Sequence, residues 1–204
     1  AEDKKAAETL AGATSEVVNS VSLNEAGIIY NYNGTADAIG ADEASRRLAL
    51  FIIVKSPRDL TAKDKNTLSY FIHLGTPTTI LLGAGERAGV LNSYLSVFNK
   101  LPRELLEWQD IIKIANGRWP DERSAVSEDR AANEFFSAIY VRQPDMDNPH
   151  DSAAVTVIAY GLRPANRNME SEKKAIEIYR SIFGKSPTGA SEWDLVRAIA
   201  YSGA

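Results

Sequence analysis

The feature that most constrains the fold is an internal repeat with a period of about 42 residues. Four short segments share the order apolar residue, any residue, basic residue, any residue, proline, and they lie at 53–57, 98–102, 140–144 and 183–187. Glycines recur with the same period, at Gly34, Gly75, Gly117, Gly161 and Gly203. Two independent markers that keep one period indicate copies of a single supersecondary unit, which bury one another's apolar faces.

Each unit is expected to contain two helices, of which the first carries apolar residues at helical spacing. In the last copy this apolar stripe consists of Ile176, Tyr179, Ile182 and Phe183. The first copy is apolar on more sides, so we expect it to lie deeper in the protein; its apolar residues are Leu48, Phe51, Ile52 and Ile53. The basic residue of the shared segment would lie near the negative end of this helix, and the proline would stop it.

The second helix of each unit has a start signal of its own, because a hydroxyl or amide side chain stands three residues before an acid. The expected pairs are Ser22 with Glu25, Thr61 with Asp64, Asn148 with Asp151, and Ser191 with Asp194. In the second copy only Glu104 and Glu107 are available. The repeated glycine would close each of these helices, since glycine readily adopts the left-handed conformation.

We therefore predict an all-α protein of about four helix-turn-helix repeats of about 42 residues, stacked as a short solenoid or a compact bundle. Residues 1–34 would form an N-terminal helical arm, with Leu10, Val17 and Val18, and a half repeat. Residues 35–204 would form the repeats, at approximately 43–75, 86–117, 128–161 and 170–204. A chain of 204 residues buries about 70% of its unfolded surface, which suffices for a core without disulfides.

Composition excludes several classes of function. The chain has a net charge of −4 and no basic block, so nucleic acid is not an expected partner. Its longest apolar run, at 48–54, is too short to span a membrane. There is no cysteine, and no nucleophile or phosphate-binding motif is present, so we expect a protein that is not an enzyme and has no cofactor.

The acidic loop at 145–151 is the one segment that resembles a metal site. It contains Asp145, Asp147, Asn148, His150 and Asp151, whose oxygens could hold calcium. The order of ligands in an EF-hand is absent, and the repeat assigns Asn148 and Asp151 to helix capping. We favour capping, with calcium as the alternative.

Aromatic residues recur at equivalent places in different copies, namely Trp108 with Trp193 and Tyr160 with Tyr201. The same residue type at equivalent positions is expected where repeats share one core, so these four residues are interpreted as packing residues. Trp119 instead lies in a connection beside Pro120, where it would either cover the core or anchor a partner. The connection at 80–82 is also apolar, and if it is exposed it would form a contact patch.

The last copy, residues 171–204, carries a family resemblance. From Ser171 and Glu172 it continues through the 183–187 segment and Trp193 to the ending at 198–204. In these residues it resembles a helical repeat of predicted exported and surface proteins from poorly characterised bacterial lineages. The resemblance implies a bacterial, surface-associated protein. That group has no assigned activity, so no catalytic residues are carried over.

These observations lead to three functional hypotheses. The chain begins with Ala1 rather than methionine, as a mature protein does after signal cleavage, so we expect an extracellular or cell-surface location. The first hypothesis is an exported structural protein that forms a homo-oligomer or polymer, as a filament or layer. The alternative is a monomeric repeat module that binds a peptide or glycan. The third is an enzyme or calcium-dependent protein centred on Asp145, Asp147 and Asp151.

Overall fold

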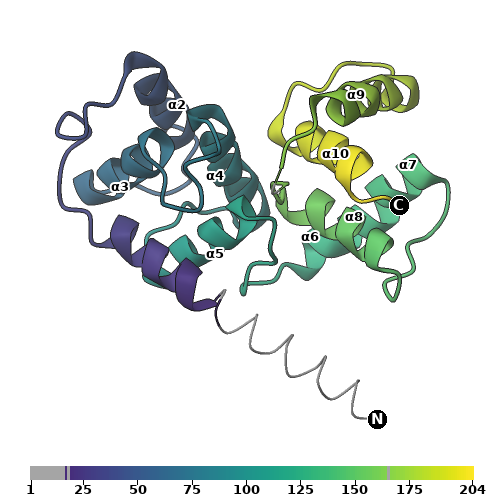
Figure 1. Cartoon of the computed structure of the whole chain (residues 1–204), viewed down its shortest axis with the longest axis horizontal. Coiled ribbons are helices and arrows are strands. Elements are labelled where there is room, and N and C mark those ends of the chain that lie inside the picture. Colours follow the sequence, from purple (N-terminus) through teal and green to yellow (C-terminus); the bar gives the residue numbers. More distant parts are fainter. Residues whose placement is uncertain (1–16, 18, 165) are drawn as a thin grey trace, which may run out of the picture.

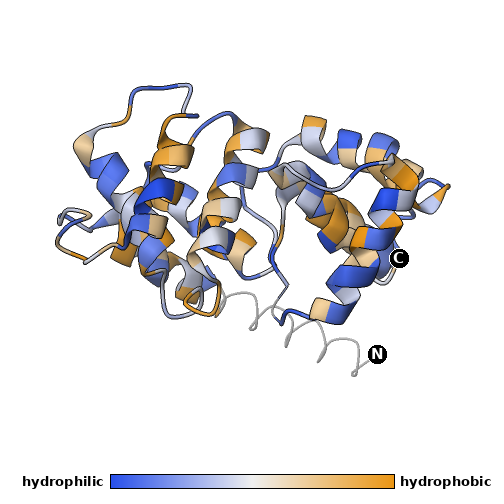
Figure 2. Ribbon diagram, turned by 90° about the horizontal axis from the view of Figure 1, so that it is seen from above, coloured by the Kyte–Doolittle hydropathy of each residue, from blue (hydrophilic) through white to orange (hydrophobic). Residues whose placement is uncertain are grey.

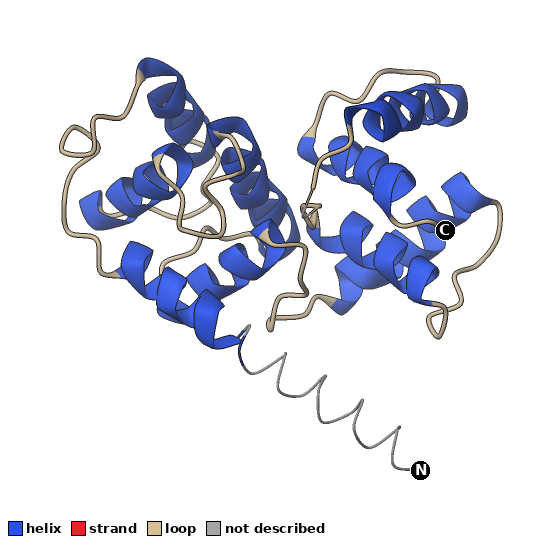
Figure 3. Cartoon of the chain, in the orientation of Figure 1, coloured by secondary structure: helices blue, strands red, loops and turns tan. Residues whose placement is uncertain are grey.

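All of the regular secondary structure in the residues that the structure describes is helical. The computed structural model describes residue 17, residues 19–164 and residues 166–204, and no strand occurs within them (Figure 3). This confirms the predicted all-α class. The first described helix covers residues 19–30. Leu10 and Val18, expected in a leading helix, lie outside the described residues.

Helices follow one another in pairs along the rest of the chain. The first helices of the pairs are α2 (Glu43–Ile53), α4 (Ala84–Phe98), the continuous run of α6 (Ala125–Arg130), η1 (Ala131–Phe136) and α7 (Ser137–Tyr140), and α9 (Met169–Phe183). The second helices are α3 (Ala62–His73), α5 (Leu105–Ala115), α8 (Pro149–Tyr160) and α10 (Ala190–Tyr201). Each repeated proline lies in the connection within a pair, as the period predicts. The number of equivalent repeats stays a prediction.

The pairs gather into two lobes rather than a linear stack (Figure 1). The first lobe contains the helix at 19–30 and α2 to α5, and the second contains α6 to α10. The two lobes also lie side by side when seen from above (Figure 2). Helix α4 of the first lobe packs against both α8 and α10 of the second. Because the last pair returns to the second pair in this way, the arrangement is a compact bundle.

The core repeats an aromatic pair on three of the first helices. The ring centroids are 4.6 Å apart for Tyr94 and Phe98, and 4.5 Å apart for Phe136 and Tyr140. In the last pair, Tyr179 and Phe183 are again 4.6 Å apart. Residues four apart on a helix lie on one face, so each pair buries a large apolar area at the same place in its unit.

Helix α2 lies at the edge of the first lobe, which corrects the expectation that it would be the deepest. Leu50, Phe51 and Val54 are 60%, 52% and 68% exposed, whereas Ala49 and Ile52 are buried. Its main neighbours are α3 and α4. A helix with neighbours on one side has one face to bury, and the additional apolar residues of α2 remain at the surface.

The basic residue of the last three repeated segments has a different role from the one predicted. Instead of facing the end of its own helix, it crosses the corner to the acid in the first turn of the next helix, whereas Lys55 of the first segment donates to Asn92 of α4 at 3.0 Å. Lys100 lies 2.8 Å from Glu107, Nη2 of Arg142 donates to Asp151 at 2.6 Å, and Lys185 pairs with Glu192. The same acids accept backbone N–H groups, so each corner is held by one carboxylate.

Helix capping follows the predictions in two copies and departs from them in two others. Thr61 and Asp64 form the predicted capping box, and Asn148 caps α8. Ser22 lies inside the helix at 19–30, where its hydroxyl donates to the carbonyl of Asn19, so it caps nothing. Ser191 lies inside α10, whose N-cap is Gly189.

The glycines that end the second helices have the predicted conformation in four cases. Gly75, Gly117, Gly161 and Gly203 have φ of 70°, 71°, 69° and 75°. Gly34 does not, because the helix at 19–30 ends before it and a turn separates the two.

The third pair accommodates one extra residue in a π-helical turn. Its first core aromatic, Phe136, lies twelve positions after the N-cap Ser124. In α4 and α9 the corresponding residues lie eleven positions after theirs. The π-helix η1 falls between these two points and takes up the addition, and the aromatic pair keeps its place in the core.

Candidate functional site

Several polar side chains of the acidic loop at 145–151 form hydrogen bonds within the loop or with Arg142. The carboxylate of Asp151 accepts from Arg142 and from the backbone N–H of Asp145. Asp145 accepts from the N–H of Asp147 at 3.0 Å, and Asn148 accepts from the N–H of His150 at 2.9 Å. Over the residues that the structure describes, no group of three or more histidine and carboxylate side chains is placed to hold a metal ion.

The equivalent aromatic residues do not share one environment. Trp108 is buried, edge-on to Phe71 with the ring centroids 5.8 Å apart. Trp193, interpreted as a packing residue, is 36% exposed. Trp193 lines a cavity beside α4, so it is not packed in the core as Trp108 is.

The two connections singled out by sequence also differ. Trp119 is half-buried against the core, with its ring centroid 6.0 Å from that of Tyr160, so it covers the core. Ile80 and Leu81 are exposed, whereas Leu82 is buried.

A cavity of about 260 Å³ lies where α4 of the first lobe faces α9 and α10 of the second. We call it the interlobe cleft. Its apolar wall consists of Gly85, Gly89, Ala190, Trp193 and Val196. Its polar wall consists of Glu86, Arg163, Arg167, Glu172 and Arg197. An apolar wall with a few convergent polar groups is the usual composition of a ligand site.

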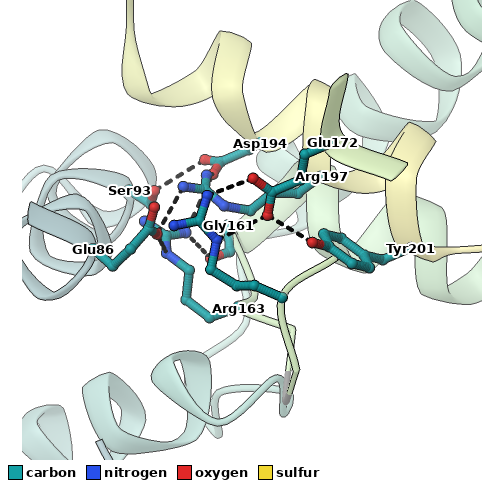
Figure 4. Close-up of polar contacts among 9 residues, drawn as sticks. Glu86, Ser93, Gly161, Arg163, Glu172, Asp194, Arg197 and Tyr201 are labelled. Atoms are coloured by element: carbon teal, nitrogen blue, oxygen red, sulfur yellow. Dashed lines mark hydrogen bonds and ion pairs between the residues drawn. The ribbon is translucent and has the colours of Figure 1, made fainter. Parts of the chain in front are cut away.

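Arg163 is the centre of the polar wall and is only 1% exposed. Its Nε lies 2.9 Å from a carboxylate oxygen of Glu86, and its Nη1 lies 3.4 Å from Asp194 (Figure 4). Nη1 also donates to the carbonyl of Gly161. Burial lowers the pKa of Arg163 to about 10, so the guanidinium is charged at neutral pH.

Arg197 completes the network between the lobes. It lies 2.7 Å from Asp194 and 2.9 Å from Glu86. Ser93 of α4 donates to Asp194 at 2.9 Å. Burial would raise the pKa of Glu86, but the neighbouring arginines outweigh burial and hold it below the usual value. At Asp194 burial prevails and raises the pKa.

Helix α4 admits this network because small residues face it. Gly85, Gly89 and Ser93 follow one another at intervals of four and therefore lie on one face. A Cβ atom at Gly89 would lie 2.6 Å from Nη2 of Arg163, so any side chain at this position would have to displace the buried guanidinium. Sequence reasoning missed this site, although the spacing of small residues on α4 was a usable signal.

The other end of the polar wall is a triad that occurs twice in the second lobe. In the last pair, Nε of Arg167 donates to Glu172 at 2.9 Å, and Glu172 accepts from the hydroxyl of Tyr201 at 2.6 Å. The N–H of the N-cap residue Asn168 donates to the same hydroxyl at 2.9 Å. The ion pair with Arg167 lowers the pKa of Glu172.

The third pair repeats these bonds. Nε of Arg123 donates to Glu128 at 2.6 Å, Glu128 accepts from Tyr160, and the N–H of the N-cap Ser124 donates to that hydroxyl at 2.9 Å. Here an aromatic ring is added, since the guanidinium of Arg123 lies 3.9 Å from the ring centroid of Trp119.

The two triads differ in the residue that lies four positions before their arginine. Arg123 and Arg167 are 44 positions apart, as are Glu128 and Glu172, and the same offset places Arg163 where the third pair has Trp119. The side chain of Arg163 turns towards the first lobe instead of lying on the triad (Figure 4).

Comparison with known proteins adds no relative: no family model, no curated protein and no solved structure matches the chain. No helix in the described part of the chain combines the length and the apolar character that crossing a membrane requires.

Proposed function

We propose that this chain is a binding module without catalytic activity, and that its ligand occupies the interlobe cleft. The observation that carries the proposal is that the part of the junction formed by α10 differs from the same positions of α8. Aligned on Tyr160 and Tyr201, the positions of Trp193, Asp194 and Arg197 correspond in α8 to Ser152, Ala153 and Thr156. Packing between repeats favours the same residue type at equivalent positions, whereas a binding site needs residue types that the other repeats do not have.

The chemistry of the cleft favours binding over catalysis. Its carboxylates, Glu86 and Glu172, are both engaged by arginines, and the pKa of each is lowered. A general acid or base works best with a pKa near the working pH, and these carboxylates are held away from it. Their paired charges also nearly cancel, so the ligand would be recognised by shape and hydrogen bonding rather than by net charge.

The test is a ligand screen read at the cleft itself. Peptide and glycan libraries are added to the ¹⁵N-labelled chain, and the indole N–H resonance of Trp193 is followed. We expect a ligand that shifts this resonance and whose binding is lost in Trp193→Ala. The matched control is Leu81→Ser, which changes an exposed residue outside the cleft. Ligands that bind Trp193→Ala as well as the wild type, or no ligand at all, would contradict the proposal.

A second candidate function, a structural subunit exported to the cell surface, is supported by the outer face of α2. Leu50, Phe51 and Val54 form an exposed apolar stripe at the edge of the first lobe. Such a patch suits association between copies of the chain. Sedimentation and electron microscopy at high concentration would reveal oligomers or polymers that Leu50→Ser and Val54→Ser disperse. A monomer at all concentrations would leave the binding module as the better proposal.

A further inference from the structure

We propose that the interlobe cleft accepts an aromatic side chain from a peptide segment of a partner protein, stacked on the guanidinium of Arg167. This inference rests on the proposed function and names the chemistry of the ligand. It depends on an internal comparison, because the second lobe contains the same triad twice and only one copy has an aromatic ring on it.

The third pair shows what fits on such a triad. The edge of the Arg123 guanidinium is bound to Glu128, and its face is covered by the indole of Trp119 at 3.9 Å. A guanidinium that is hydrogen-bonded along its edge keeps two flat faces, which are weakly hydrated and stack well on aromatic rings. The chain therefore supplies its own aromatic partner at this triad.

The fourth pair has the same bonds without the ring. Arg167 is bound along its edge to Glu172 through Nε and Nη2. Among the described aromatic residues, none has its ring over Arg167. The residue at the position of Trp119 is Arg163, which is committed to Glu86 and Asp194. A ring on the triad of the fourth pair would therefore have to be supplied by a ligand.

The cleft offers the rest of an aromatic site at this place. Arg167 lines the cavity together with Trp193 and Val196, which provide apolar contact. On α4, nothing lies within 4 Å of the Cβ position at Gly85, so there is open space beside this residue, whereas Gly89 is covered by Arg163. Nearly half of the Arg167 side chain remains exposed, so a ligand can reach it.

The experiment compares two probes, N-acetyl-L-tryptophanamide and N-acetyl-L-leucinamide, by ¹⁵N NMR titration of the whole chain. We expect the tryptophan amide to bind more tightly, with its ring current moving the Arg167 Nε–H resonance upfield. Arg167→Lys keeps the charge and loses the flat face, so its affinity for the tryptophan amide should fall by about fivefold. Arg123→Lys is the matched control, because that face is already covered by Trp119, and it should bind as the wild type does.

The outcomes separate this inference from the proposed function. Equal affinity for both amides, or unchanged affinity in Arg167→Lys, would overturn the aromatic inference. Shifts of the Trp193 resonance in the same titrations would still support a ligand in the cleft. If library ligands without aromatic rings bind at Trp193 and the tryptophan amide does not, the inference also fails alone. If no probe and no library ligand shifts Trp193, both fail. The Arg167 resonance of the wild type decides between these outcomes even if a variant is unstable.

Discussion

The two lobes make the same contact at the start of their first helices, but with opposite charges. The fourth residue after the N-cap is Arg46 in α2 and Arg87 in α4, whereas it is Glu128 in the third pair and Glu172 in α9. In all four cases this residue is bonded to the residue just before the N-cap. The contact between these two positions therefore recurs in every repeat, although the residue types at the positions differ.

The group that bonds to this helical residue differs between the lobes, because the charge of the residue differs. In the first lobe, Arg46 donates to the carbonyl of Ala41 at 2.8 Å, and Arg87 donates to the carbonyl of Leu82. In the second lobe the helix supplies the carboxylate, and the arginine stands before the N-cap. The cation therefore moves from the helix to the connection that precedes it.

This reversal decides which lobe can present a guanidinium to a ligand. Arg87 is buried and donates to three further carbonyls, those of Ile72, His73 and Thr79. Its faces are enclosed by the protein. Arg167, held along one edge by a single carboxylate, keeps an open face at the interlobe cleft. In the first lobe the guanidinium binds the carbonyls of the connections, whereas in the second lobe one of its faces remains open to a ligand.

The largest effect is expected from the removal of Arg163, which joins the lobes. Arg163→Met leaves Glu86 and Asp194 with one cation fewer at the junction between the lobes. Removing one partner of a buried ion pair typically costs about 3–5 kcal/mol. We expect a loss of that size in the free energy of unfolding, measured by urea denaturation.

A coupled variant controls for this prediction. Gly89→Ala should destabilise the wild type, because its new methyl group meets Arg163, and should cost much less in the Arg163→Met background. Independent, additive effects of the two substitutions would show that Arg163 does not fill the space against α4.

The next largest effect is expected within the first lobe. Arg87→Ala leaves several buried carbonyls without a donor, which should cost about 2–3 kcal/mol in unfolding free energy. The matched control is Arg46→Ala, since Arg46 is half exposed and its effect should stay below about 1 kcal/mol. Similar losses for both variants in urea denaturation would contradict the difference in burial on which the comparison rests.

The fold could be predicted from sequence because its signals are local. Helical spacing of apolar residues and the repeated prolines indicated the class and the places of the connections. The capping errors have a physical cause. A hydroxyl three residues before an acid also occurs inside helices, as Ser22 shows, and at α10 the backbone of Gly189 takes the cap position because Glu192 can reach it.

The candidate site could not be predicted in the same way because its residues meet only in the tertiary structure. Glu86, Arg163 and Asp194 belong to different parts of the chain, and none of them is unusual in its own segment. The repeat even concealed the site, since it suggested that Trp193 would pack as Trp108 does. The departure from the repeat, Arg163 in the place of Trp119, was the informative feature.

A smaller effect is expected at the corner after α7, where Val141 has a φ of 55°. A β-branched residue in the left-handed region is strained, and Val141 is 88% exposed, so packing does not require it. Val141→Gly should therefore stabilise the chain by about 1 kcal/mol in thermal or urea unfolding. The equivalent Asn99, with a φ of 52°, tolerates this conformation better, and Asn99→Gly should change stability by only a few tenths. Equal gains would show that the residue type is not the source of strain.

The smallest expected effect is a difference in pH dependence that follows from the reversed charges. The ion pair with Arg167 holds the pKa of Glu172 below its ordinary value. A carboxylate whose pKa is lowered by folding stabilises the protein above its unfolded value, about 4.3, and that contribution is lost as the pH falls through the folded value. Glu172→Gln should thus cost up to about 1 kcal/mol at neutral pH, and the cost should shrink towards pH 3. In the first lobe the corresponding acceptors are carbonyls, which do not titrate, so the cost of Arg87→Ala should be the same at both pH values. Urea denaturation of the three proteins across this range measures both costs, and a constant cost for Glu172→Gln would mean that its charge does not hold the triad.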